Sequence, residues 1–104
     1  MHLVINTNEY CGGGETLVER FLTSVNSSKC LISSQGYLSS VIDQSKILKI
    51  DELSMLSSND SVLFLNFRDL FKFGFKIKKT GCTINYYCLH IYDPMYQSLN
   101  YPLS

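Results

Sequence analysis

Residues 1–15 read MHLVINTNEYCGGGE, and this stretch decides the fold class of the chain. A strand-like apolar run ends at Thr7, a short polar segment follows, and three consecutive glycines lead into a helical pattern that begins near Glu15. Because glycine lacks a Cβ atom, a ligand can approach the main chain closely, and the unpaired N–H groups of the next helix face the same space. The stretch therefore predicts the first strand, loop and helix of a parallel α/β domain.

The glycine loop also has a simpler explanation, since three glycines can merely form a tight turn between a strand and a helix. Two well-known phosphate-binding loops do not fit its spacing. A G-x-G-x-x-G fingerprint needs glycine where Leu17 stands, and a Walker loop needs Gly-Lys-Ser or Gly-Lys-Thr, which the sequence lacks. Nor does an acidic residue stand near Ile32 or Ser33, about 20 residues past the first glycine, where a dinucleotide's ribose is held. Dinucleotide binding is therefore not expected.

The rest of the chain alternates apolar runs with helical patterns, which is typical of repeated β-α units and of a sheet covered on both faces. We predict strands at residues 2–7, 29–33, 46–50, 61–66 and 82–90. The expected fold class is α/β: a Rossmann-like three-layer sandwich whose mostly parallel sheet has about five strands. Residues 1–104 are expected to form a single domain of this kind.

Four stretches between these strands have helical character. The first covers residues 15–26, and its apolar side consists of Leu17, Phe21, Leu22 and Val25. A shorter helix is marked by Tyr37, Leu38, Val41 and Ile42. Residues 51–58 are ambiguous and could form one helical turn with Leu53 and Leu56 inward. The last helix carries basic residues on one side, Arg68, Lys72, Lys76 and Lys79, and apolar residues on the other, Phe67, Leu70, Phe71 and Ile77.

The composition is that of one small globular domain, with 104 residues, 45% of them hydrophobic and 17% charged. Nine basic side chains balance nine acidic ones, so no nucleic-acid partner is expected. No run approaches the about 20 apolar residues of a membrane span, and the first residues lack the basic and apolar segments of a signal peptide. These features predict a cytoplasmic protein.

The four cysteines, at positions 11, 30, 82 and 88, form no Cys-x-x-Cys pair, and only two histidines, His2 and His90, accompany them. A zinc cage is therefore not expected, and no other metal site is indicated. Cys82 and Cys88 would lie about 20 Å apart on one strand, far beyond disulfide reach. Reduced thiols are the simplest interpretation.

Ligands of open parallel sheets bind beyond the carboxyl ends of the strands. The predicted strands would gather polar residues from separate segments at that edge, namely residues 6–14, Ser33, Ser34, Gln35, Asn66, Arg68, His90 and Asp93. Polar loops are common at any strand end, so this gathering does not by itself define a site. His90 stands out because it ends an apolar strand, where an imidazole either bonds a backbone carbonyl or contacts a ligand.

The glycine loop and the residues around His90 together resemble the N-terminal Rossmann-like half of a GT-B glycosyltransferase, and the chain is most similar to the large retaining family 4. In that family a Gly-Gly-Ala-Glu loop opens the first helix, and Gly12-Gly13-Gly14-Glu15 matches it with Gly for Ala. A later strand of the family ends in His followed by a polar or acidic residue, and residues 87–94 (YCLHIYDP) occupy that place. Asp93, however, follows His90 by three positions instead of one.

The resemblance implies an acceptor-side domain that works on a nucleotide-sugar donor and an acceptor glycan or lipid carrier. Gly12, Gly13 and Gly14 would contact the donor diphosphate or the acceptor, and His90 would be the catalytic imidazole beside the transferred sugar. Asn66 is expected to join these substrate contacts because of its place at the carboxyl edge of the sheet. No cofactor and no metal are implied. The family's main nucleotide-sugar site, with its Glu-x7-Glu motif, belongs to a C-terminal domain that has no counterpart in this sequence. The chain is thus expected to be inactive without a donor domain or partner subunit.

The basic side of the last helix has two interpretations. Arg68, Lys72, Lys76 and Lys79 can form an ordinary solvated helix face, or they can contact an anionic membrane surface or the phosphate of a lipid-linked acceptor. Two other functions also stay open. Cys11 directly precedes the glycines, as in a cysteine phosphotransfer domain whose thiolate is activated by helix N-terminal amides. A non-catalytic Rossmann-like binding module would need no chemistry from either motif.

Overall fold

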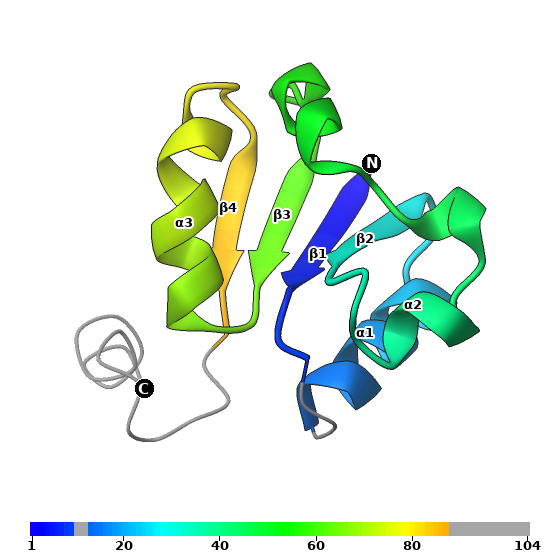
Figure 1. Ribbon diagram of the computed structural model, residues 1–104. Helices are drawn as coiled ribbons and strands as arrows, with labels where there is room; N and C mark the ends of the chain where they lie inside the picture. Colours follow the sequence, from blue (N-terminus) through cyan, green and yellow to red (C-terminus); the bar gives the residue numbers. More distant parts are fainter. Residues whose placement is uncertain (10–12, 88–104) are drawn as a thin grey trace.

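The computed structural model describes residues 1–9 and 13–87, which form an α/β fold around one parallel sheet (Figure 1). Its strands are β1 (His2–Asn6), β2 (Ser28–Ile32), β3 (Ser61–Phe64) and β4 (Thr83–Tyr86), in the order β2-β1-β3-β4. Its helices are α1 (Gly13–Ser24), α2 (Leu38–Val41) and α3 (Phe67–Lys78), together with the 3₁₀ helices η1 (Gln44–Lys46) and η2 (Ile50–Met55). The predicted fold class is confirmed, with a sheet of four strands in the described residues.

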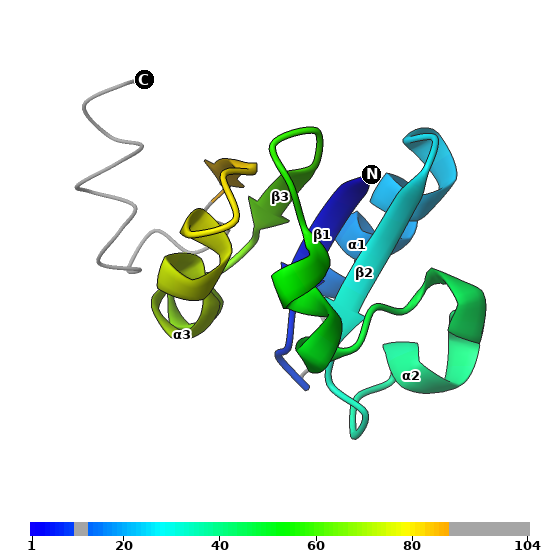
Figure 2. The same cartoon turned by 90° about the horizontal axis from the view of Figure 1, so that it is seen from above.

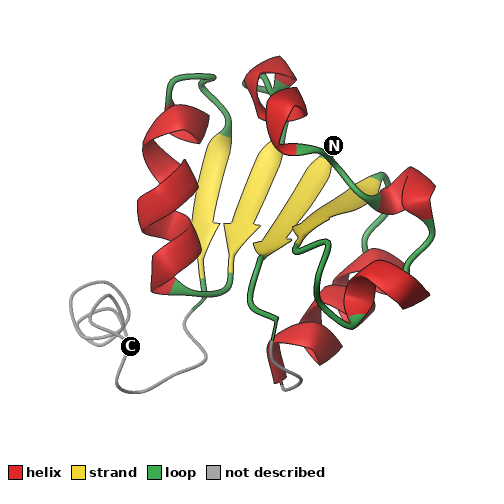
Figure 3. Cartoon of the chain, viewed as in Figure 1, coloured by secondary structure: helices red, strands yellow, loops and turns green. Residues whose placement is uncertain are grey.

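Successive side chains of a strand point to opposite faces of the sheet, and here both faces carry apolar side chains. Helices cover both faces. Leu3 and Ile5 of β1 pack on the face covered by α3 and η2, in one cluster with Phe73. Val4 points to the other face and packs in a second cluster with Val18 of α1. Seen from above, α1 and α3 lie on opposite sides of the sheet (Figure 2). The strands thus form the middle layer of a three-layer sandwich (Figure 3).

The predicted strand at residues 46–50 is wrong. Among the described residues, this segment pairs only through an isolated parallel bridge, between Ile47 and Cys30 of β2. η1 ends directly before the bridge and η2 begins shortly after it, so no length remains for a ladder. A carboxylate caps each of these 3₁₀ turns, Asp43 for η1 and Glu52 for η2, and these local hydrogen bonds compete with strand pairing.

Two other elements appear close to where the sequence predicts them. α1 begins at Gly13, and its fully buried side chain is Val18, whereas Leu17, Phe21 and Leu22 of the predicted apolar side pack only partly. η2 provides the helical turn expected within residues 51–58. Leu53 and Leu56 are buried there, as predicted.

α3 turns only part of its predicted apolar side to the sheet: Ile77 is buried and Leu70 packs against the core, as expected. Asp69, Phe73 and Ile77, spaced four residues apart, are buried, whereas Phe71 is 81% exposed. The predicted inward position of Phe71 is therefore wrong. The reason lies at the start of the helix, where the Asp69 carboxylate accepts a hydrogen bond from the Thr7 amide and so fixes which side faces the sheet.

β4 ends at Tyr86, inside the strand predicted over residues 82–90. The end of that predicted strand, with His90, lies outside the described residues. None of the helices in the described part of the chain is long and apolar enough to cross a membrane.

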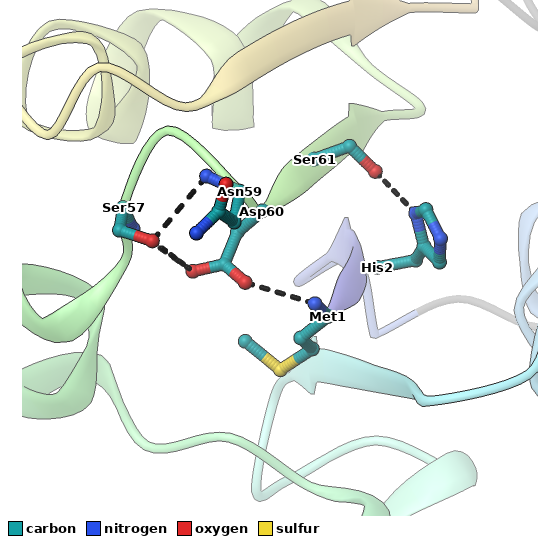
Figure 4. A network of polar contacts seen from close by, with 6 residues as sticks. All are labelled: Met1, His2, Ser57, Asn59, Asp60 and Ser61. Atoms are coloured by element: carbon teal, nitrogen blue, oxygen red, sulfur yellow. Dashed lines mark hydrogen bonds and ion pairs between the residues drawn. The ribbon is translucent and has the colours of Figure 1, made fainter.

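A polar network ties the start of β1 to the loop before β3 (Figure 4). The N-terminal ammonium of Met1 donates to Asp60 Oδ1 over 2.9 Å, and the Ser57 amide donates to Asp60 Oδ2 over 2.9 Å. Beside it, His2 Nδ1 and Ser61 Oγ lie 2.6 Å apart. These contacts hold β1 and β3 together at the amino end of the sheet.

Removing the Asp60 carboxylate should make the free energy of unfolding depend less on pH in the acid range. The pKa of Asp60 lies below its ordinary 3.8, first because the N-terminal ammonium donates a hydrogen bond and then because the Ser57 amide does. A carboxyl group with a lowered folded pKa adds stability above its unfolded pKa and loses it as the pH falls through its folded pKa. Asp60→Ala should therefore cost about 1 kcal/mol at neutral pH and progressively less below about pH 4. Urea unfolding at neutral and acid pH measures this, and an equal loss at both would contradict it.

Candidate functional site

The carboxyl ends of β1 and β3 meet at the point where the chain changes direction across the sheet. β1 pairs with β2 on one side and with β3 on the other, so the chain moves outward to β2 and then crosses back past β1. Such a switch point leaves a crevice at the carboxyl edge, where open α/β sheets bind ligands. Residues 7–9 follow the end of β1 directly, and Asn66 lies two residues past the end of β3.

A buried hydrogen-bond network joins the two strand ends. Asp69 of α3 is fully buried, and its carboxylate accepts from the Thr7 amide and from the Asn66 side-chain amide, each over 2.8 Å. The Thr7 hydroxyl is a further donor to the same carboxylate. Asn66 caps α3 by accepting from the Asp69 amide over 2.7 Å, and it also donates to Asn6 Oδ1 over 3.2 Å. β1, β3 and α3 are thereby fixed to one another.

Arg68 carries this network to the surface. Its Nη2 donates to the Thr7 carbonyl over 3.3 Å and to Asn8 Oδ1 over 3.0 Å, while the side chain stays exposed. The guanidinium is therefore held in one place and still accessible to a ligand. Asn66, in contrast, is 7% exposed, and both ends of its side-chain amide are bonded within the network. Its contact with a ligand stays a prediction.

A groove with a volume of about 1150 Å³ opens beside the network, between α3 and residues 44–51. Thr7 and Arg68 belong to both the network and the groove wall. Ser33 and Ser34 line the groove just past the end of β2. The groove therefore lies at the carboxyl edge of the sheet, where the sequence predicts a ligand site.

Cations outnumber carboxylates on the groove wall. The lining residues include the cations Arg68, Lys72, Lys76 and Lys49 and the carboxylates Glu9 and Asp51. Glu9 accepts a hydrogen bond from Ser33 Oγ over 3.1 Å, and the Lys72 ammonium lies 5.3 Å from the centre of the Phe73 ring. Lys76 has no hydrogen-bond or ion-pair partner for its ammonium among the residues that the structure describes. The groove is thus suited to an anion such as a phosphate group.

The predicted basic side of α3 is divided between two surfaces. Arg68, Lys72 and Lys76 line the groove, but Lys79 does not. Its ammonium lies 4.7 Å from the centre of the Phe75 ring instead. No sequence pattern marks Lys49 as a groove residue, because residues 46–50 have the composition of a buried strand.

The start of α1 is described only in part. α1 begins at Gly13, whereas Cys11, Gly12 and His90 lie outside the described residues, so their roles stay predictions. Glu15, in the first turn, is 6% exposed, and neither of its carboxylate oxygens has a hydrogen-bond partner in the described part of the chain. A carboxylate at the N-terminus of α1 repels a phosphate group that would bind there. The cations of the groove are therefore the better phosphate site.

The cysteines of the described residues are buried. Burial raises the pKa of the Cys30 thiol from 9.0 to about 11, so the reactive thiolate is disfavoured. Cys82 Sγ lies 3.7 Å from the Ile77 carbonyl oxygen. Within residues 1–9 and 13–87, no cluster of three or more His, Cys, Asp or Glu could hold a metal ion.

No family model matches the chain, no curated protein matches it, and no solved structure matches it. The resemblance to GT-B glycosyltransferases gains no support from these comparisons. The function is therefore inferred from the geometry of the groove and from the motifs of the sequence.

Proposed function

We propose that the chain is the acceptor-side half of a two-domain glycosyltransferase of the GT-B type, and that the groove receives the phosphate-bearing part of the acceptor. The observation that carries this proposal is the position of a cationic groove at the switch point of a parallel sheet. The Gly12-Gly13-Gly14-Glu15 loop and His90 supply the enzyme class by resemblance.

The groove residues suit an acceptor that presents a phosphate and sugar hydroxyls. A guanidinium binds phosphate through paired N–H donors, and Arg68 is held ready for this by its bonds to Thr7 and Asn8. Lys72 and Lys76 add positive charge on flexible side chains. The volume of about 1150 Å³ exceeds the about 300–1,000 Å³ of pockets for drug-sized molecules, so a sugar joined to a phosphate has room.

Sugar transfer needs a second site that the groove does not provide. In this proposal another domain or subunit holds the nucleotide of the donor and faces the carboxyl edge of the sheet. The departing diphosphate is then stabilised between the two halves by prearranged N–H groups and cations. The chain alone is proposed to bind the acceptor and to transfer no sugar.

Binding of a hexose phosphate to the isotope-labelled chain, followed by NMR, tests the groove. The expected result is a set of saturable shifts at Ser33, Arg68, Lys72 and Lys76. Hexose phosphate and inorganic pyrophosphate should both produce them, and the free hexose should not, because the cations recognise the phosphate. Shifts confined to other residues, or equal shifts with the uncharged hexose, would contradict a phosphate site in the groove.

The transferase class is tested separately, in a two-domain protein reconstituted with a donor-side domain. Gly13→Val and His90→Ala should each abolish sugar transfer, since one blocks the approach to the main chain and the other removes the imidazole. Circular dichroism should show both variants folded, and each should keep its affinity for hexose phosphate. Turnover that survives both substitutions would refute these roles. A protein that binds hexose phosphate and never transfers sugar would be a non-catalytic binding module.

A further inference from the structure

Two phenylalanines of α3 lie in solvent, one turn apart. Phe71 is 81% exposed and Phe75 is 74% exposed, while Phe73 and Ile77 are buried on the opposite side of the helix. Because that buried side fixes the helix, neither exposed ring can turn inward. The centre of the Phe71 ring lies 6.0 Å from that of Phe67, so the aromatic strip continues along the helix. Adjacent exposed aromatic side chains of this size mark an interaction surface.

Two lysines lie at the C-terminal end of the helix that carries the exposed rings. Lys78 ends α3 and Lys79 caps it, and the Lys79 ammonium lies 4.7 Å from the centre of the Phe75 ring. The acid of α3, Asp69, is fully buried, so α3 presents cations to solvent without an exposed carboxylate of its own. We define the outer face of α3 as Phe71, Phe75, Lys78 and Lys79.

A partner for the outer face must offer negative charge and an apolar layer close together. An anionic lipid surface does so, because aromatic rings enter the boundary between headgroups and acyl chains while lysines reach the phosphates. A second copy of the chain would bring like charges together in a twofold interface. Single-stranded nucleic acid is bound along a basic groove with stacked aromatic rings, whereas this face is the convex outside of a helix.

We propose that the outer face of α3 docks the protein on an anionic lipid surface. Phe71 and Phe75 enter the interfacial layer, and Lys78 and Lys79 contact headgroup phosphates. The groove then opens beside the lipid, since Lys72 and Lys76 of the same helix line it. This docking goes beyond the proposed function and does not depend on what the groove binds.

The sequence contains no tryptophan, so a single introduced tryptophan reports on this face alone. Emission of Phe75→Trp should shift to the blue with vesicles of equal parts phosphatidylglycerol and phosphatidylcholine, and should stay unchanged with phosphatidylcholine alone. The matched control is Val41→Trp, which should not respond. Val41 is 50% exposed and belongs to α2, far from α3 along the sheet (Figure 1).

Three results would overturn the proposal. The first is an unchanged emission of Phe75→Trp with the anionic vesicles. The second is a blue shift that grows with protein concentration in the absence of vesicles, which assigns the face to a second copy. The third is a stronger shift with a mixed-sequence oligonucleotide than with vesicles, which assigns it to nucleic acid.

Sedimentation with the same anionic vesicles measures the size of each contribution. Phe71→Ser and Phe75→Ser should each weaken binding about tenfold, because each removes a ring from the interfacial layer. Lys78→Glu and Lys79→Glu should each weaken it at least about fivefold, whereas Lys46→Glu on η1 should leave it unchanged. Raising the ionic strength from about 0.1 M to about 1 M should release the protein, since the Debye length falls from about 10 Å to about 3 Å.

The serine variants distinguish the lipid-docking proposal from the proposal that the groove binds phosphate. Neither Phe71 nor Phe75 lines the groove, so both variants should still bind hexose phosphate and unfold in urea like the wild type. Vesicle binding that is equal in the wild type and in both serine variants would overturn the docking proposal. It would leave the phosphate site untouched.

Discussion

Replacing Asp69 with alanine should lower the free energy of unfolding by about 3–5 kcal/mol. The carboxylate is fully buried and accepts from the Thr7 amide, the Thr7 hydroxyl and the Asn66 side chain. Alanine removes both carboxylate oxygens, so three donors lose their acceptor at once, and each buried donor left unsatisfied costs about 1–3 kcal/mol. A small domain has a total stability of about 5–15 kcal/mol, so the loss is a large part of it. Urea denaturation followed by circular dichroism measures the change.

Two further variants show whether this loss belongs to the network. Asp69→Asn keeps the size of the side chain and one acceptor, so it should lose roughly half as much. Asp51→Ala removes an exposed carboxylate from the groove wall and should change stability by less than about 0.5 kcal/mol. Similar losses for Asp69→Ala and Asp51→Ala would mean that the apolar side of α3, and not the network, positions the helix.

The position of Asp69 also decides which residues reach the groove. Consecutive residues of an α-helix are rotated by about 100° about the helix axis. If α3 were rotated by one residue position, a different set of its side chains would face residues 44–51. With Asp69 inward, Lys72 and Lys76 line the groove, and Phe71 and Phe75 lie in solvent. One hydrogen-bond network therefore sets the charge of the groove and the character of the outer face.

The fold class follows from patterns that are local in the sequence. β1 and β3 are short apolar runs bounded by polar residues, and α1 follows a glycine loop, so each element can be predicted alone. Parallel pairing then follows from the alternation of strands and helices. The same reasoning places polar residues at the carboxyl edge, where the groove is found.

The details that the sequence does not reveal depend on distant contacts. α3 carries two apolar strips, one through Phe71 and Phe75 and one through Phe73 and Ile77, and helical periodicity cannot choose between them. The choice is made by the hydrogen bond from Thr7 to Asp69, residues that are far apart in the sequence. Residues 46–50 are apolar enough for a strand, but the neighbouring 3₁₀ turns leave room for a single bridge. Lys49 consequently reaches the groove wall without any sequence signal.

Reversing two groove charges together, Lys72→Glu with Lys76→Glu, should weaken pyrophosphate binding about hundredfold. Both ammonium groups line the groove, and that of Lys76 has no ion-pair partner among residues 1–9 and 13–87. A hydrogen bond to a charged group contributes about 1.5–3 kcal/mol, and about 1.4 kcal/mol corresponds to a factor of ten in affinity. Two lost contacts therefore give two factors of ten, and the new carboxylates repel the ligand further. Titration calorimetry at low ionic strength measures the affinity.

The matched control is Lys29→Glu with Lys46→Glu, which changes the net charge equally. Lys29 lies near the amino end of β2, and Lys46 ends η1; together they line a separate small cavity. If the overall charge of the protein attracted pyrophosphate, both double variants would bind it equally weakly, and the groove would lose its role. If the groove binds the phosphates directly, only the first variant loses affinity. The difference in pyrophosphate affinity between the two double variants should become smaller at high salt, because salt screens exposed charges.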